Sequence, residues 1–243
     1  MRTILWFIYF WLYLLAVLPY NLYVKSKIKQ GKKEEIAPLV ENIVKKWANR
    51  LLKAAGVTVH VTGTEYIPQE AALFVANHQG NFDIPITLCK LGPLKSMVAK
   101  KELAKLPGIH SWMTFFDCIF MDRKDPRQSL KCLTRAQELL ENGQSVVIFP
   151  EGTRSKGPKI GEFKPGALRC ALKAEVPIVP VAIDGSYRAM EQQGIWIRPA
   201  TVNVTVLPPI ITKELEKERT KIISEEIRTL IASQLDKKTE EHL

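Results

Sequence analysis

The chain has 243 residues, with 35 Lys and Arg against 25 Asp and Glu, which gives a formal net charge of +10 at pH 7. Hydrophobic residues make up 46% and charged residues 25% of the sequence; this composition is typical of a chain that folds around a core, and it excludes a disordered tail, a collagen-like repeat and a polytopic transporter. The length indicates one core domain with at most an appendage, and the charge favours a negatively charged partner: nucleic acid, an anionic bilayer or a phosphorylated substrate.

The amino-terminal end carries most of the positive charge. Residues 1–56 contain ten Lys and Arg residues against three Glu residues. Within this stretch, residues 4–24 form a run of 21 uncharged residues, and residues 3–24 hold eight of the twenty aromatic side chains. As a straight helix the run would be about 32 Å long, enough to cross a hydrocarbon core of about 30 Å.

This apolar run predicts an amino-terminal membrane anchor. Pro19 interrupts it, and Trp and Tyr side chains, which prefer the headgroup level of a bilayer, are spread along it. The run therefore either crosses the bilayer or lies in one leaflet. The basic stretch from Lys25 to Lys33 favours the cytoplasmic face of the cell (inner) membrane for the chain that follows.

Residues 36–55 show an apolar stripe of helical period, with basic side chains on the opposite face. A surface helix packed on the core has the same pattern. Its place directly after the membrane segment favours an interfacial helix. The predicted organisation is an anchor with a basic amphipathic helix over 1–56, an α/β domain over 57–211 and a carboxy-terminal helix over 212–243.

From residue 57 onward, strand and helix patterns alternate, which predicts the α/β fold class: a single domain with a mixed or parallel sheet flanked by helices. Helices are expected after Asp83, over 126–142, over 165–174 and over 213–235. The expected strands are 57–62, 73–76, 96–99, 119–121, 145–149, 178–183 and 202–207. The four cysteines have no CxxC spacing, so free thiols in a reducing compartment are expected.

The first chemical motif follows the strand expected at 73–76. It reads NHQGNFD, and it holds His78 and Asp83. Five residues apart on one helix, these side chains would point away from each other, so they meet only if the chain turns from strand through loop into helix. Asp83 would suit the N-cap of that helix, where its carboxylate could hold one imidazole nitrogen and leave the other as a general base.

A second motif follows the strand at 145–149 and reads FPEGTRS. Gly152 lets the backbone approach a ligand, Thr153 offers a hydroxyl, and Arg154 offers a planar fork for phosphate. Glu151 precedes them. A third segment, IFMDR, places Arg123 directly after another expected strand.

Taken in this order, the motifs resemble the glycerolipid acyltransferase family, specifically the bacterial 1-acyl-sn-glycerol-3-phosphate acyltransferases. His78 and Asp83 fit the HxxxxD signature of that family, Glu151, Gly152, Thr153 and Arg154 fit its acceptor-binding EGTR block, and Arg123 falls on its acceptor-phosphate arginine. Two positions depart from the family pattern. Gly80 stands where Ser is frequent, and Asp117 stands where Gly is common.

The resemblance implies transfer of a fatty acyl group from acyl carrier protein or coenzyme A to the sn-2 hydroxyl of lysophosphatidic acid, giving phosphatidic acid. His78 would be the general base and Asp83 would orient it, Arg123 and Arg154 would neutralise the phosphate, and Glu151 would orient the acceptor or the arginines. The thioester is a cosubstrate, and neither cofactor nor metal is expected, because the chain has no HExxH motif and only four His.

Other functions remain open on the sequence. Glycerol 3-phosphate, a lysophospholipid or an aminoacyl lipid could replace lysophosphatidic acid as acceptor. A non-catalytic binder of anionic membranes or nucleic acid would use the same net charge. Outside residues 1–56, however, the surplus of positive charge is only three, so an anionic membrane is the expected partner and nucleic acid is not.

Overall fold

The computed structural model describes residues 1–213 and 215–240, so residues 214 and 241–243 of the predicted carboxy-terminal segment lie outside the described residues. All seven expected strands are present, each within two residues of its predicted ends. The strands are β1 (Val57–Thr62), β2 (Leu73–Ala76), β3 (Ser96–Lys100), β4 (Ile119–Met121), β5 (Val146–Ile148), β6 (Ile178–Asp184) and β7 (Ala200–Val206). The α-helices are α1 (Arg2–Ala16), α2 (Leu18–Lys29), α3 (Lys33–Ala55), α4 (Asp83–Lys90), α5 (Ile109–Phe115), α6 (Pro126–Glu141), α7 (Arg169–Ala174) and α8 (Lys217–Glu240).

The strands form one mixed sheet in the order β1-β7-β6-β2-β5-β3-β4. The pairs are parallel except β6–β7, which is antiparallel. Strand β2, with the sequence LFVA, is buried at every position because it lies inside the sheet and both its faces are covered. Strand β1, at the edge of the sheet, has the alternating burial of a strand with one covered face. The predicted α/β fold is confirmed.

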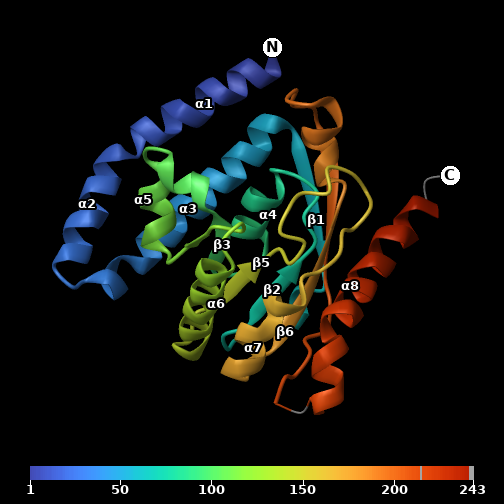
Figure 1. Cartoon of the computed structure of the whole chain (residues 1–243). Coiled ribbons are helices and arrows are strands. Elements are labelled where there is room, and N and C mark those ends of the chain that lie inside the picture. Colours follow the sequence, from blue (N-terminus) through green and yellow to red (C-terminus); the bar gives the residue numbers. More distant parts are fainter. Residues whose placement is uncertain (214, 241–243) are drawn as a thin grey trace.

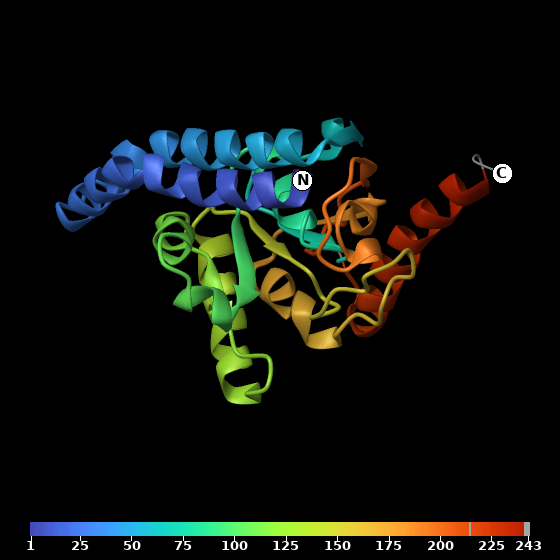
Figure 2. The same cartoon turned by 90° about the horizontal axis from the view of Figure 1, so that it is seen from above.

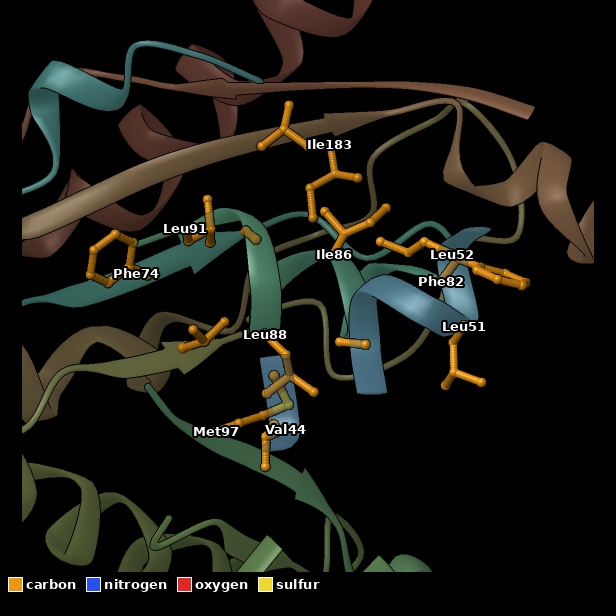
Figure 3. Packing of buried hydrophobic residues seen from close by; sticks show 14 of the residues in the cluster. Val44, Leu51, Leu52, Phe74, Phe82, Ile86, Leu88, Leu91, Met97 and Ile183 are labelled. Atoms are coloured by element: carbon orange, nitrogen blue, oxygen red, sulfur yellow. The ribbon is translucent and has the colours of Figure 1, made fainter. Parts of the chain in front are cut away.

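Helices cover both faces of the sheet (Figures 1 and 2). Alternate residues of β2 belong to two separate cores: Phe74 and Ala76 pack with α3, α4 and α5, whereas Leu73 and Val75 pack with α6, α7 and α8. In the first core, side chains of α3 and α4 meet those of the strands in one layer (Figure 3). This packing fixes α4, whose first residue is Asp83.

Helices α1 and α2 form the amino-terminal segment on the outside of α3. They are bent by 44° at a short break that precedes Pro19. No single helix among the described residues is long and apolar enough to cross a membrane. The bent pair of α1 and α2 has the length and composition for a span only when the two helices are taken together. Helix α1 runs alongside α3 (Figure 2), and its Trp6 Nε1 donates a hydrogen bond of 3.0 Å to the carbonyl oxygen of Leu51.

The apolar stripe of α3 faces the protein interior. Val40, Val44, Leu51 and Leu52 are at most 4% exposed and pack against α4 and the sheet. The interpretation of α3 as an interfacial helix is therefore wrong, because helical periodicity reports an apolar face without identifying what covers it. Helix α1 presents the exposed apolar face instead. The domain boundaries at 56/57 and 211/212 stay predictions.

Candidate active site

Loops from four strands meet at one edge of the sheet. Since β2, β4, β5 and β6 all run parallel, the segments that follow them emerge on the same side. The carboxyl edge of such strands is the usual place for a ligand site in an α/β fold. The sequence-predicted site residues all follow β2, β4 or β5, so the topology gathers motifs that are far apart in the chain.

The structure brings His78 and Asp83 into contact. His78 Nδ1 lies 2.7 Å from Asp83 Oδ2, which also accepts a hydrogen bond of 2.8 Å from the Gly80 backbone N–H. The Asp83 side chain is fully buried and that of His78 is 11% exposed. A carboxylate can only accept, so this contact assigns the proton to Nδ1 and leaves Nε2 as the basic nitrogen.

The predicted N-cap position of Asp83 is wrong. Phe82 occupies the N-cap of α4, without a side-chain hydrogen bond, and Asp83 is the first helical residue. Its carboxylate turns back toward the loop because His78 and Gly80 supply its hydrogen bonds. The predicted turn from strand through loop into helix is confirmed.

Side-chain amides hold the β2 loop against β6. The Asn77 amide is bidentate: it donates to the Ile183 carbonyl oxygen at 2.9 Å and accepts from the Ile183 N–H at 2.8 Å. Gln79 Oε1 accepts from the Gly185 N–H at 2.9 Å. On the other side, the His78 ring stacks on Phe149, with centroids 4.3 Å apart. The imidazole is thus fixed before any substrate binds, as catalysis requires.

Glu151 links two loops beside the histidine. Its Oε1 accepts a hydrogen bond of 2.6 Å from the His78 backbone N–H, and its Oε2 accepts one of 2.8 Å from the Gly161 N–H. Burial raises the pKa of Glu151 above its ordinary value, although the two N–H donors oppose this. Both oxygens are therefore engaged with backbone, and a role of Glu151 in orienting the acceptor or the arginines stays a prediction.

The two arginines connect the β5 loop to its neighbours: Arg123 reaches it from the segment after β4, and Arg154 extends from it toward the His78 loop. Arg123 Nη1 donates a hydrogen bond to the carbonyl oxygen of Gly152. Burial lowers the pKa of Arg123 below its ordinary value, but a guanidinium stays protonated at neutral pH. Arg154 Nη1 donates to Asn81 Oδ1 at 2.5 Å, so Arg154 lies beside the loop that carries His78.

The backbone conformation at Gly152 explains why the second motif has a glycine there. Gly152 has a φ of +70°, in the left-handed region that favours glycine. An added Cβ would lie 3.1 Å from the Cε and Nζ atoms of Lys164, so this lysine covers the turn. Thr153 is exposed beside it. The turn therefore gathers Arg123, Arg154 and Lys164, three cations that could bind an anionic group.

Sequence reasoning missed Glu191, in a short 3₁₀ turn (Glu191–Gln193) after β6. Its Oε1 lies 3.0 Å from Arg154 Nη1. No local motif marks this residue, because its partners lie far away in the chain. Across the described part of the chain, no group of three or more His, Cys, Asp or Glu side chains is placed to hold a metal ion. All four cysteines are free thiols, as expected.

A buried His–Asp pair beside clustered cations, at the carboxyl edge of a mostly parallel sheet, fits transfer chemistry on an anionic substrate. The chain belongs to the Acyltransferase family, whose model matches residues 58–184.

Individual relatives are more specific. The chain is 39% identical to "Probable 1-acyl-sn-glycerol-3-phosphate acyltransferase" of Mycoplasma pneumoniae, over 57% of this chain and 53% of that protein. It is 35% identical to "1-acyl-sn-glycerol-3-phosphate acyltransferase LPAT1, chloroplastic" of Arabidopsis thaliana, over 73% of this chain and 49% of that one. The chain thus spans about half the length of these relatives.

A solved structure resembles the whole chain. The crystal structure of the 1-acyl-sn-glycerophosphate (LPA) acyltransferase PlsC from Thermotoga maritima matches with a TM-score of 0.77 and 27% identity, over 98% of both chains. The likeness therefore includes the amino-terminal helices, which lie outside the range of the family model.

Proposed function

We propose that this protein transfers a fatty acyl group from a thioester to the sn-2 hydroxyl of 1-acyl-sn-glycerol 3-phosphate, giving phosphatidic acid. The observation that carries the proposal is the buried contact of 2.7 Å between His78 Nδ1 and Asp83 Oδ2. The names of its relatives support the choice of acceptor.

In the proposed mechanism, His78 Nε2 takes the proton from the acceptor hydroxyl as its oxygen attacks the thioester carbonyl. The new C–O bond forms, the C–S bond breaks, and the imidazolium returns its proton to the departing thiolate. Asp83 stabilises the imidazolium that forms between these steps. A general base placed in this way contributes about 10²–10⁴-fold to the rate. No acyl-enzyme is needed, because a thiolate is a good leaving group.

The acceptor phosphate would bind at the β5 turn. Arg123 is anchored to Gly152 in the β5 turn and Arg154 to Asn81 in the His78 loop, so protein contacts hold both guanidinium groups in place. A phosphate monoester carries up to two negative charges and accepts bidentate hydrogen bonds from guanidinium. A phosphate bound at this turn would lie next to the His78 loop, which Glu151 and Arg154 both contact.

The thioester donor, acyl carrier protein or coenzyme A, would meet the acceptor at a membrane surface. Helix α1 lies flat along α3, where Phe10 contacts Trp47 and Tyr13 contacts Arg50. A helix covered in this way along one face supports an anchor that lies in a single leaflet. Anionic headgroups at the cytoplasmic face of the cell membrane would attract the basic residues that follow.

The test is a transfer assay with the purified protein, using both thioester donors. The acceptors are lysophosphatidate, glycerol 3-phosphate, lysophosphatidylcholine and monoacylglycerol. We expect phosphatidic acid from lysophosphatidate, and a loss of at least about 10³-fold in kcat for His78→Ala. Asp83→Asn should lose a comparable factor, since the amide cannot stabilise the imidazolium.

Circular dichroism and vesicle binding establish that each variant is folded and membrane-bound. Wild-type activity in a folded His78→Ala protein would overturn the mechanism. Product formed only from an acceptor without phosphate would overturn the choice of substrate.

A further inference from the structure

A buried carboxylate lies on the arginine that is proposed to bind the phosphate. The side chain of Glu191 is 4% exposed, and its Oε1 accepts hydrogen bonds from Arg154 Nη1 at 3.0 Å and from the Asn81 backbone N–H at 2.8 Å. Glu191 thereby joins three loops: its own after β6, the His78 loop after β2 and the Arg154 loop after β5.

Gly80 makes the room for this carboxylate. A Cβ added at Gly80 would lie 2.3 Å from Glu191 Oε2, closer than any real contact of that kind, and 2.9 Å from the carboxyl carbon. The φ of Gly80 is not in the left-handed region, so space rather than backbone conformation requires glycine here. A Ser at this position, which is frequent in the family, would collide with the Glu191 carboxylate, so Gly80 and Glu191 fit together.

The contacts divide the Arg154 guanidinium into two edges. The hydrogen bonds to Asn81 and to Glu191 both run through Nη1. In the part of the chain that the structure describes, this leaves Nη2 and Nε for another acceptor. Two adjacent N–H groups in the plane of a guanidinium match two oxygens of a phosphate.

One carboxylate oxygen of Glu191, Oε2, is buried without a hydrogen-bond donor among the described residues. A buried carboxylate oxygen that lacks a donor is unfavourable. The hydrogen bonds that Oε1 accepts from Arg154 and from the Asn81 N–H offset this cost, so the position of the carboxylate is tied to that of Arg154.

We propose that Glu191 is a positioning residue that fixes Arg154 for the acceptor phosphate, and that Gly80 leaves the space that the Glu191 carboxylate occupies. The inference rests on the proposed function and deepens it by assigning the phosphate-binding geometry to a residue outside the acyltransferase motifs. Without Glu191, the guanidinium would rotate among several orientations, and the phosphate would have to order it on binding.

The first measurement is steady-state kinetics with lysophosphatidate. We expect Glu191→Ala to raise the KM for lysophosphatidate about tenfold, while the kcat and the KM for the thioester change by less than about twofold. Glu191→Gln, which keeps an oxygen for Arg154 and Asn81, should recover about half of the loss on a logarithmic scale. An unchanged acceptor KM, or a fall in kcat alone, would overturn the proposal.

A double-mutant cycle tests the spatial claim. Gly80→Ser should displace the carboxylate and raise the acceptor KM about as much as Glu191→Ala does. In the Glu191→Ala background, Gly80→Ser should add less than about twofold, since the group it would strike is gone. In an Arg154→Ala background, Glu191→Ala should likewise add nothing. Independent, multiplying effects in either cycle would contradict the inference.

A binding measurement separates this inference from the proposed reaction. The shift in melting temperature is followed with 1-oleoyl lysophosphatidate and, as matched control, with 1-oleoylglycerol, which lacks the phosphate. Glu191→Ala should weaken the apparent affinity about tenfold for the first ligand and leave the second unchanged. This readout needs no turnover, so an inactive wild type would overturn the reaction while the binding result still decides the role of Glu191. Equal effects on both ligands, or on neither, would refute that role.

Discussion

Lys95 is a buried cation at the opposite end of the sheet from the candidate active site. It lies directly before β3, its residue is 4% exposed, and its Nζ donates to the carbonyl oxygens of Leu91 and of Pro93, the latter at 2.9 Å. The same Nζ lies 4.3 Å from the ring centroid of Phe74. Burial lowers the pKa of Lys95 to about 8, from an ordinary value of 10.5.

This shift predicts how stability depends on pH. Between pH 8 and 10.5 the unfolded chain keeps the Lys95 proton whereas the folded protein releases it, so the free energy of unfolding should rise with pH. The full contribution across that window is about 3 kcal/mol. Urea unfolding of the wild type and of Lys95→Met at pH 7.5, 8.5 and 9.5 isolates it. The free energy of unfolding of the wild type should rise relative to that of the variant as pH increases. Parallel plots of this free energy against pH would show that the pKa of Lys95 is not lowered.

At the residue scale, the sequence predicted the parts of the site that lie within one motif. His78 and Asp83 share a single loop, and a strand–loop–helix turn is enough to bring them together. Glu191 could not be found in this way, because it contacts Asn81 from 110 residues away. The need for glycine at position 80 could not be predicted either, because the group that leaves no room for a Cβ there is the carboxylate of Glu191, which is far away in the sequence.

Asp117 connects secondary-structure elements where the family resemblance expects glycine. It lies between α5 and β4 with a φ of 58°, in the left-handed region, where Asp is tolerated better than most residues. Its Oδ2 lies 2.5 Å from the Nζ of Lys33, the first residue of α3, and its Oδ1 lies 4.0 Å from Nη2 of Arg135 in α6. Asp117 lacks the conformational freedom of glycine at this turn, but its carboxylate contacts two helices.

Substitutions of Asp117 should separate the effect of its strained backbone conformation from the effect of its ion pair with Lys33. We expect Asp117→Ala to lower the free energy of unfolding by about 1–2 kcal/mol, because Ala keeps the strained φ and loses the contact. Asp117→Gly also loses the contact, but glycine adopts the positive φ without strain, so it should lower that energy by less than about 1 kcal/mol. Lys33→Ala is the matched control that leaves the turn untouched and should resemble Asp117→Gly. Equal losses for Ala and Gly in thermal or urea unfolding would contradict the argument from φ.

At the element scale, the strands could be predicted but their arrangement could not. Short apolar runs bounded by turn residues identify each strand locally. The order β1-β7-β6-β2-β5-β3-β4 and the antiparallel β6–β7 pair depend on contacts between distant segments. The partner of α3 was missed for a related reason: its periodicity identifies an apolar face, and the protein core, not a bilayer, covers that face.

At the scale of the whole molecule, one side carries an uncovered apolar surface. Ile4, Ile8, Trp11 and Leu12 of α1 are 47–60% exposed. Trp196, in the turn after Glu191, is 55% exposed and lines an apolar hollow of about 570 Å³ together with α1. A contiguous apolar surface of this kind marks a site of association. Together with Lys27 and Lys29 in the last turn of α2, farther along the same amino-terminal segment, this surface supports the proposed contact with an anionic bilayer.

Charges introduced into this surface should therefore release the protein from membranes. We expect Leu12→Glu with Trp196→Glu to lower co-flotation with vesicles of phosphatidylglycerol and phosphatidylcholine at least about tenfold, because two carboxylates would have to enter an apolar, negatively charged interface. Leu130→Glu is the matched control, since Leu130 is 59% exposed on α6, across the sheet from α1. It should float like the wild type. If the double variant floats equally well, the bilayer contacts a different face; if Leu130→Glu is released too, net charge rather than this surface controls binding.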